Sequence, residues 1–207
     1  MIGLKFGEKH SHNDYGLILT SKDIEFPTPK VETIDIPHSD GSLDFISEPI
    51  KFKNRKLSFE FAKPEFQKNM LKTFDNIASE IHGQKMKITL DDDAGYYYFG
   101  RCTITSFQTL QGYFTFKVDV DAEPYRLKQT ITEKILSQGI NTLHNGQKAV
   151  VPQFETSDSV TIAFNDKTFT HSKGNFKIPE IEFIKGDNIL QITGGGTVKI
   201  TYQEGDL

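Results

Sequence analysis

Turn signals recur at short, regular intervals in the last third of the sequence, and this feature constrains the fold more than any other. Between the turns lie short segments in which apolar and polar side chains alternate. Strands separated by turns about every 8–12 residues are typical of an antiparallel β-sandwich. We therefore predict a compact all-β unit over residues 148–207. The turn signals are Asn165–Asp166, Lys173–Gly174, Gly186–Asp187 and the glycines at 194–196.

Phenylalanine is unusually frequent, with 17 copies beside 7 tyrosines and no tryptophan. Aromatic side chains fit the half-buried surface of a strand, so this composition favours β structure. In the C-terminal unit the phenylalanines are predicted to fill the core. They are Phe154, Phe164, Phe169, Phe176 and Phe183.

One helix is predicted, over residues from about 65 to 82. Its apolar residues recur at intervals of three or four and therefore lie on one side, which we expect to pack across a sheet. Gly83 follows the last turn, where a left-handed cap is often needed. The residues of the apolar stripe are Phe66, Met70, Phe74, Ile77 and Ile81.

The sheet under this helix is predicted from alternating segments on both sides of it. Residues 56–62 alternate so that Leu57, Phe59 and Phe61 point inward. After the helix, alternating segments follow around Met86, Ile88 and Leu90, over 96–109 and over 113–121, and the last two are joined by a tight loop.

These elements divide the chain into two domains. We predict an α+β domain over residues 1–126, with one amphipathic helix packed on a sheet. Residues 127–147 are expected to be a connector with early strands of the second unit, and 148–207 the antiparallel β-sandwich. The predicted fold class is therefore mostly β.

A hairpin is predicted between about residues 31 and 47, because two alternating segments flank an Asp40–Gly41 turn. Its flanks are polar and charged, so it is expected to project as an arm. The edge of such a hairpin can add to the sheet of a neighbouring copy. The candidate interface residues are Ile34, Ile36, Leu43 and Phe45.

The charge balance gives no sign of a nucleic-acid or membrane partner. The chain has 24 Lys and Arg against 28 Asp and Glu and no basic run, so tight binding to a phosphate backbone is not expected. The first residues lack the apolar core of a signal peptide, and no apolar stretch approaches the ~20 residues of a membrane span. We expect a protein that is made and folded in the cytoplasm.

Two clusters of possible metal ligands stand out, and we favour a structural interpretation of each. In a strand, His10, His12 and Asp14 would face one side and could hold a metal, but the turn signal there favours an exposed turn. The acids at 91–93 are adjacent, whereas a calcium loop spaces its ligands by two and ends on a glutamate where this chain has Cys102. A loop whose Asp side chains bond their own backbone is favoured.

No residue pattern indicates catalysis. Cys102, the single cysteine, can form no internal disulfide and lies in mid-strand with no base nearby, so we interpret it as a sheet residue. Tyr96, Tyr97 and Tyr98 could anchor a sugar or an interface, but packing within the sheet is favoured. We predict no catalytic residue, cofactor or metal, and hence no enzyme.

Several segments together resemble the distal tail protein family of long-tailed phages and prophages. They are MIGLKFGEKHSHNDYGLILTS, NRKLSFEF, HGQKMKITLDDDAGYYYFGRCTITSF, the hairpin ending in VDVDAEPYRLK, and the run from VVPQFET to the C-terminus. The resemblance covers nearly the whole chain, and it rests on the order of the segments, because no single short motif is specific.

The resemblance implies a structural role in the virion. Members form a ring, usually a hexamer, at the tail tip. Their N-terminal domain builds the ring and joins the tail tube protein to the tail-tip hub protein or baseplate, and DNA passes through the lumen without specific binding. Their C-terminal domain is a galectin-like sandwich, which in some phages supports a receptor-binding protein.

Two other functions compete with this one. A carbohydrate-binding module for attachment to the host cell wall would use the C-terminal sandwich, but a galectin-type site needs a tryptophan platform, which this chain lacks. A cell-wall hydrolase would need paired carboxylates in a recognisable setting, and the sequence shows none.

Overall fold

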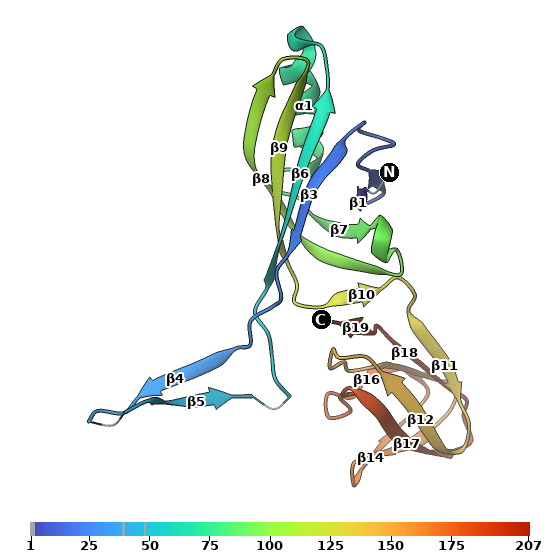
Figure 1. Ribbon diagram of the computed structural model, residues 1–207. Helices are drawn as coiled ribbons and strands as arrows, with labels where there is room; N and C mark the ends of the chain where they lie inside the picture. The colour runs from blue at the N-terminus through green and yellow to red at the C-terminus, as the bar shows by residue number, and fades with distance from the viewer. Residues whose placement is uncertain (1–2, 39, 48) are drawn as a thin grey trace. The chain divides into compact units, whose positions relative to one another are not determined.

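The computed structural model describes residues 3–38, 40–47 and 49–207, and the chain divides into two compact units, Met1–Arg126 and Leu127–Leu207 (Figure 1). Strands account for 57% of the residues and helices for 9%, which confirms the predicted mostly-β fold class. Among the described residues, no helix is long and apolar enough to cross a bilayer.

The first unit is built on an antiparallel sheet with the strand order β2-β1-β7-β8-β9-β6-β3. One of the two long ladders joins β8 and β9 through the two-residue turn Gln111–Gly112, in which Gly112 has a positive φ of 83°. The strands are β1 Leu4–Phe6, β2 Lys9–His10, β3 Ile18–Ile24, β6 Arg55–Pro64, β7 Lys85–Leu90, β8 Tyr96–Leu110 and β9 Tyr113–Ala122, and the short β10 Arg126–Lys128 follows.

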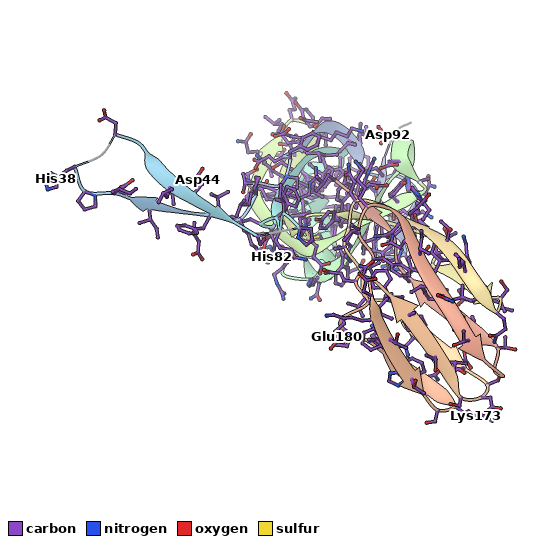
Figure 2. All side chains as sticks on the ribbon, turned by 90° about the horizontal axis from the view of Figure 1, so that it is seen from below. His38, Asp44, His82, Asp92, Lys173 and Glu180 are labelled. Atoms are coloured by element: carbon purple, nitrogen blue, oxygen red, sulfur yellow. The ribbon has the colours of Figure 1, made fainter. Side chains whose placement is uncertain are left out.

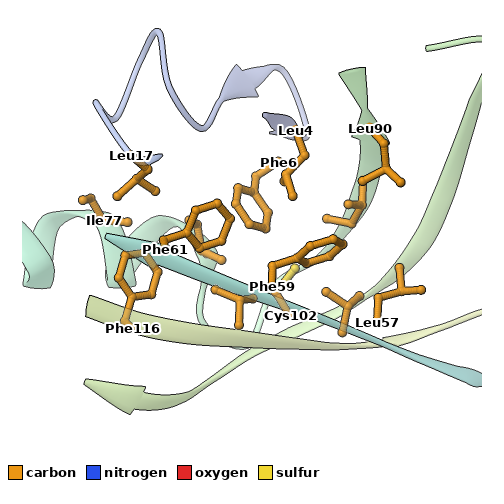
Figure 3. Close-up of a cluster of buried hydrophobic side chains, with 14 of the residues drawn as sticks. Leu4, Phe6, Leu17, Leu57, Phe59, Phe61, Ile77, Leu90, Cys102 and Phe116 are labelled. Atoms are coloured by element: carbon orange, nitrogen blue, oxygen red, sulfur yellow. The ribbon is translucent and has the colours of Figure 1, made fainter. Parts of the chain in front are cut away.

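Alternation along these strands buries one face of the sheet. Leu57, Phe59 and Phe61 of β6 are fully buried, as predicted. Phe61 stacks on Phe116 of β9 with ring centroids 5.4 Å apart, and Figure 3 shows these side chains gathered between the sheet and the N-terminal segment. Because each such aromatic ring buries a large apolar area, this cluster is the main source of stability of the first unit.

The helix α1, Met70–Ile81, packs its apolar stripe on this sheet, and the 3₁₀ turn η1, Gln67–Asn69, precedes it. Met70, Ile77 and Ile81 are buried, and Phe74 stacks on Phe107 of β8 at 4.0 Å between ring centroids.

The predicted start of the helix at residue 65 is wrong. The amide of Glu65 donates to the carbonyl of Gly112, so the chain still follows the β8–β9 turn at this point. Phe66 is consequently extended and 78% exposed rather than part of the buried stripe.

The hairpin arm consists of β4, Val31–Asp35, and β5, Ser42–Ile46, which pair only with each other. It continues the β3–β6 pair as a two-stranded ribbon. An isolated bridge joins Pro29 to Phe52, and the amide of Lys30 donates to the carbonyl of Lys51. All residues of β4 and β5 are exposed.

The second unit consists of two four-stranded antiparallel sheets, in the orders β11-β18-β13-β16 and β12-β17-β14-β15. Residues 127–147 contribute an edge strand to each sheet. The strands are β11 Thr132–Leu136, β12 Gly139–Asn145, β13 Gln153–Thr156, β14 Val160–Phe164, β15 Lys167–His171, β16 Gly174–Lys177, β17 Gly186–Gly194 and β18 Val198–Tyr202; β19 is Gly205–Asp206.

The predicted core phenylalanines lie between these sheets. Phe154, Phe164 and Phe183 are buried in the core, and Phe169 and Phe176 pack against it half-buried. The turn at Asn165–Asp166 has positive φ at both residues, as a type I′ hairpin turn requires.

Candidate assembly interface

The hairpin arm presents an apolar face that stays about half exposed in the described part of the chain. In its register Ile34 lies opposite Leu43, and Glu32 lies opposite Phe45. Because cross-strand partners point to the same side of a ribbon, Ile34, Leu43 and Phe45 share a face. Ile36 follows β4 two residues beyond Ile34. The four side chains are between 42% and 55% exposed. We call Ile34, Ile36, Leu43 and Phe45 the arm face.

The opposite face of the arm is polar along most of its length, and its one apolar pair, Val31 opposite Ile46, lies where β4 begins and β5 ends. Asp35 lies opposite Ser42, and the Thr33 hydroxyl donates to the carboxylate of Asp44 at 3.1 Å. Figure 2 shows Asp44 and the other side chains of the arm standing out from the ribbon. An isolated two-stranded ribbon is at best marginally stable in water. An amphipathic ribbon of this kind therefore has an apolar side that a partner molecule can cover.

The main sheet leaves two strand edges open. β3 is the last strand on one side of the sheet. On the other side, β7 pairs only with residues 98–101 of β8. In the described part of the first unit, residues 105–110 of β8 therefore pair with β9 on one edge and have no strand on the opposite edge. A groove lined by Phe74, Ala78 and Ile104 lies beside this edge. Open edges are templates for pairing with another chain.

The side of the sheet away from the hydrophobic core is polar. The register sets Asp23, Ser58, Asp119 and Thr103 side by side across β3, β6, β9 and β8. The next row is Ser21, Glu60, Lys117 and Ser106. We call these two rows the polar sheet face.

Opposite charges pair with each other on this face. The Ser58 hydroxyl donates to Asp119 at 2.7 Å, and the ammonium groups of Lys56 and Lys117 lie 3.0 and 3.7 Å from its carboxylate oxygens. Partial burial raises the pKa of Asp119, but these three donors outweigh burial and lower the pKa below its usual value. The lysine charges are therefore compensated within the sheet.

The histidine and aspartate cluster near the N-terminus forms a turn. His10 Nδ1 accepts hydrogen bonds from the amides of His12 and Asn13, and His10 Nε2 lies 3.0 Å from an oxygen of Asp91. The Asp14 carboxylate accepts from the His10 amide at 2.6 Å. The two ring nitrogens of His10 are thus both engaged in hydrogen bonds that hold the turn.

The three acids at 91–93 form the 3₁₀ turn η2 and point to different partners. The carboxylate of Asp91 accepts hydrogen bonds from His10 and from the Gly3 amide. Burial raises the pKa of Asp91, but these donors outweigh burial and lower the pKa below its usual value. Asp92 pairs with Lys22, and Asp93 pairs with Arg126 at 2.9 Å. The predicted loop with backbone bonds is replaced by side-chain pairs. Among the described residues, no group of three or more possible ligands is placed to hold a metal.

Cys102 and the tyrosines pack within the sheet. Cys102 is fully buried, and burial raises the pKa of its thiol to about 12. Tyr97 and Tyr98 are buried, with Lys87 over the first ring at 4.5 Å and Arg55 over the second at 5.3 Å. These contacts agree with the packing interpretation of both features.

Sequence reasoning missed the open edge of β8 and the polar sheet face. The alternating Thr115, Lys117 and Asp119 of β9 could have suggested a polar face. The open edge had no sequence signal, because it depends on where the shorter strand β7 stops pairing.

Comparisons with known proteins identify the fold. No protein-family model matches the sequence, and no curated protein matches it. Among solved structures, the chain is similar to Dit (gp 19.1), a protein of the phage SPP1 described as a paradigm of hub adsorption apparatus in phages that infect Gram-positive bacteria. The TM-score is 0.75 at 11% identity, over 98% of this chain and 99% of that one. The chain therefore has the fold of a phage distal tail protein, the family that its sequence resembles.

Proposed function

We propose that this chain is a structural, non-enzymatic subunit of a phage tail tip, which forms a hexameric ring between the tail tube and the tail-tip hub or baseplate. The observation that carries this proposal is the similarity to SPP1 Dit over the full length of both chains. An identity of 11% leaves function open, so the arrangement of the surfaces has to support the assembly.

The two open sheet edges support a ring. A copy that places its β3 edge against the free β8 edge of the next copy would continue the sheet from subunit to subunit. The two edges are different surfaces, so the contact is heterologous, and a heterologous contact closes into a ring when its rotation allows. The number six comes from the family resemblance.

The polar sheet face supports a DNA path through this ring. A continued sheet would present the polar sheet face on one side and the core and α1 on the other. Lys56 and Lys117 have their charges compensated by Asp119, and Glu60 adds a negative charge. Such a wall would let a phosphate backbone slide past without holding it, because affinity for DNA depends on uncompensated basic groups.

The C-terminal sandwich gives the carbohydrate-binding alternative no specific support. All five phenylalanines of this unit lie in the core or pack against it, so they offer no flat exposed platform for a sugar ring. We propose instead that this unit supports a receptor-binding protein.

Light scattering coupled to gel filtration tests the ring directly. One chain has a mass of 23.5 kDa, so six copies would give about 141 kDa. Electron microscopy with the tube protein or hub protein added should show the ring docked on that partner. A strict monomer at high concentration that also forms no ring with either partner would contradict the proposal.

A proline substitution at Lys22 tests the edge contact. The amide of Glu25 donates to the carbonyl of Lys56 on β6. Successive backbone amides of a strand point alternately to its two edges, and Lys22 lies three residues before Glu25, so the amide of Lys22 points to the open edge. Lys22→Pro should remove a hydrogen bond between copies and block ring formation. Lys22→Ala is the matched control, because it loses the same ion pair with Asp92 and keeps the amide. Equal assembly of the two variants would exclude β3 as the joining edge.

A further inference from the structure

The hairpin arm carries the whole net charge of the chain. Residues 31–46 contain Glu32, Asp35, Asp40 and Asp44 and no lysine or arginine. The full chain has 28 acids and 24 bases, so the remaining 24 acids are balanced by 24 bases. Within the described part of the chain, Glu32 and Asp35 form no ion pair. The arm is therefore both apolar on one face and strongly acidic.

A surface of the opposite character lies where α1 begins. Lys68, Leu71 and Lys72 are three and four residues apart, so they share one side of the helical segment. Leu71 is 63% exposed, and the neighbouring Phe66, 78% exposed, lines a groove with Pro64 and Gly112. We call Phe66, Lys68, Leu71 and Lys72 the helix-start patch.

The charges of this patch are uncompensated. Among the described residues, neither Lys68 nor Lys72 forms an ion pair. Glu65, three residues before Lys68, is engaged by other donors: its carboxylate accepts from the Phe66 amide at 2.9 Å and from the Thr73 hydroxyl at 3.1 Å. Asp75 follows Lys72 by three residues on the helix, but it forms no ion pair with Lys72 in the described part of the chain. The patch thus combines two large exposed apolar side chains with two free positive charges.

We propose that the arm of one copy docks on the helix-start patch of a second copy. This inference rests on the proposed ring and names the surface that receives the arm. The arm face covers Phe66 and Leu71, and the carboxylate of Glu32, which shares this face with Phe45, lies against the ammonium groups of Lys68 and Lys72. The two surfaces match in hydrophobicity and are opposite in charge, and among the described residues Glu32, Lys68 and Lys72 form no ion pair.

Charge reversal tests this contact. Lys68→Glu with Lys72→Glu should weaken association between copies roughly tenfold, because an exposed pair changes an equilibrium constant by a few-fold and two positions are reversed. Glu32→Lys should weaken association a few-fold, and combining it with Lys68→Glu and Lys72→Glu should recover part of the assembly that the double reversal loses. Asp35→Lys, on the opposite face of the arm, should leave assembly unchanged. Lys173→Glu with Lys177→Glu, a reversal of equal size on exposed residues of the second unit, is the matched control and should leave assembly unchanged.

Cross-linking provides an independent measurement. Chains with Leu43→Cys mixed with chains with Leu71→Cys should form covalent dimers on oxidation, whereas the buried Cys102 should not react. Rings that assemble normally in both charge-reversed variants and yield no cross-link would overturn the contact and leave the proposed function intact. A wild-type chain that never assembles would overturn both.

Discussion

Truncating the arm face should weaken assembly strongly without destabilising the subunit. Full burial of a leucine or phenylalanine side chain stabilises by about 1.5–3 kcal/mol. Leu43 and Phe45 are 52% and 55% exposed, so about half of this, roughly 1 kcal/mol each, remains available to a partner. Leu43→Ser with Phe45→Ser should therefore cost about 2 kcal/mol per contact, which weakens each contact roughly 30-fold.

The assay is light scattering over a dilution series, together with thermal unfolding of the same samples. Neither residue belongs to a hydrophobic core, so the unfolding temperature of the monomer should stay within about 2 °C of wild type. Thr33→Ala with Ser42→Ala alters the opposite face of the arm and is the matched control. A double serine variant that still forms rings at the wild-type concentration would refute the assignment of the arm face as an interface. A large fall in unfolding temperature would show that the arm face instead packs in the subunit.

Three further predictions concern the subunit itself. Gly100→Ala should cost about 1–3 kcal/mol in unfolding free energy, because a Cβ at this position would lie 2.7 Å from the backbone of β9. Gly95→Ala is the control and should cost far less, because the space around Gly95 is open. Equal denaturant midpoints for the two variants would contradict this prediction. Asp119→Asn should cost about 1 kcal/mol at neutral pH. Because the folded-state pKa of Asp119 is lowered, that difference is present above the unfolded pKa of about 3.9 and should vanish as the pH falls through the folded pKa; a difference that grows in acid would refute it. Cys102, with its pKa raised to about 12, should resist thiol reagents at pH 8 until the protein is unfolded, so rapid labelling of the native protein would be inconsistent with its burial.

The sequence was informative wherever the signal is local. Alternation identified the buried side chains of β6, and the Asn165–Asp166 turn follows from residues that tolerate positive φ. The stripe of α1 was visible from Met70 to Ile81, but Phe66 continued the same spacing by chance. Its conformation is set by the bond between Glu65 and Gly112, residues far apart in sequence, and periodicity carries no information about such a bond.

The candidate site was accessible from the sequence only in part. The arm residues Ile34, Ile36, Leu43 and Phe45 were selected because they lie on a hairpin expected to project and to pair with a neighbour, and the structure places them exposed on one ribbon. Whether they form an interface stays a prediction. The open β8 edge and the polar sheet face depend on strand register and on the length of β7, which result from packing of the whole sheet.

The low identity to SPP1 Dit separates what the fold requires from what assembly requires. A TM-score of 0.75 at 11% identity shows that alternation and turn positions can specify this architecture with very different side chains. Core positions such as Phe59 need only an apolar side chain of suitable size. Exposed apolar residues such as Phe45 and Phe66 contribute little to the subunit, and they would favour aggregation if nothing covered them. Their partners must therefore be sought outside the single chain, and the opposite charges of the arm and of the helix-start patch are what the proposed contact between two copies requires.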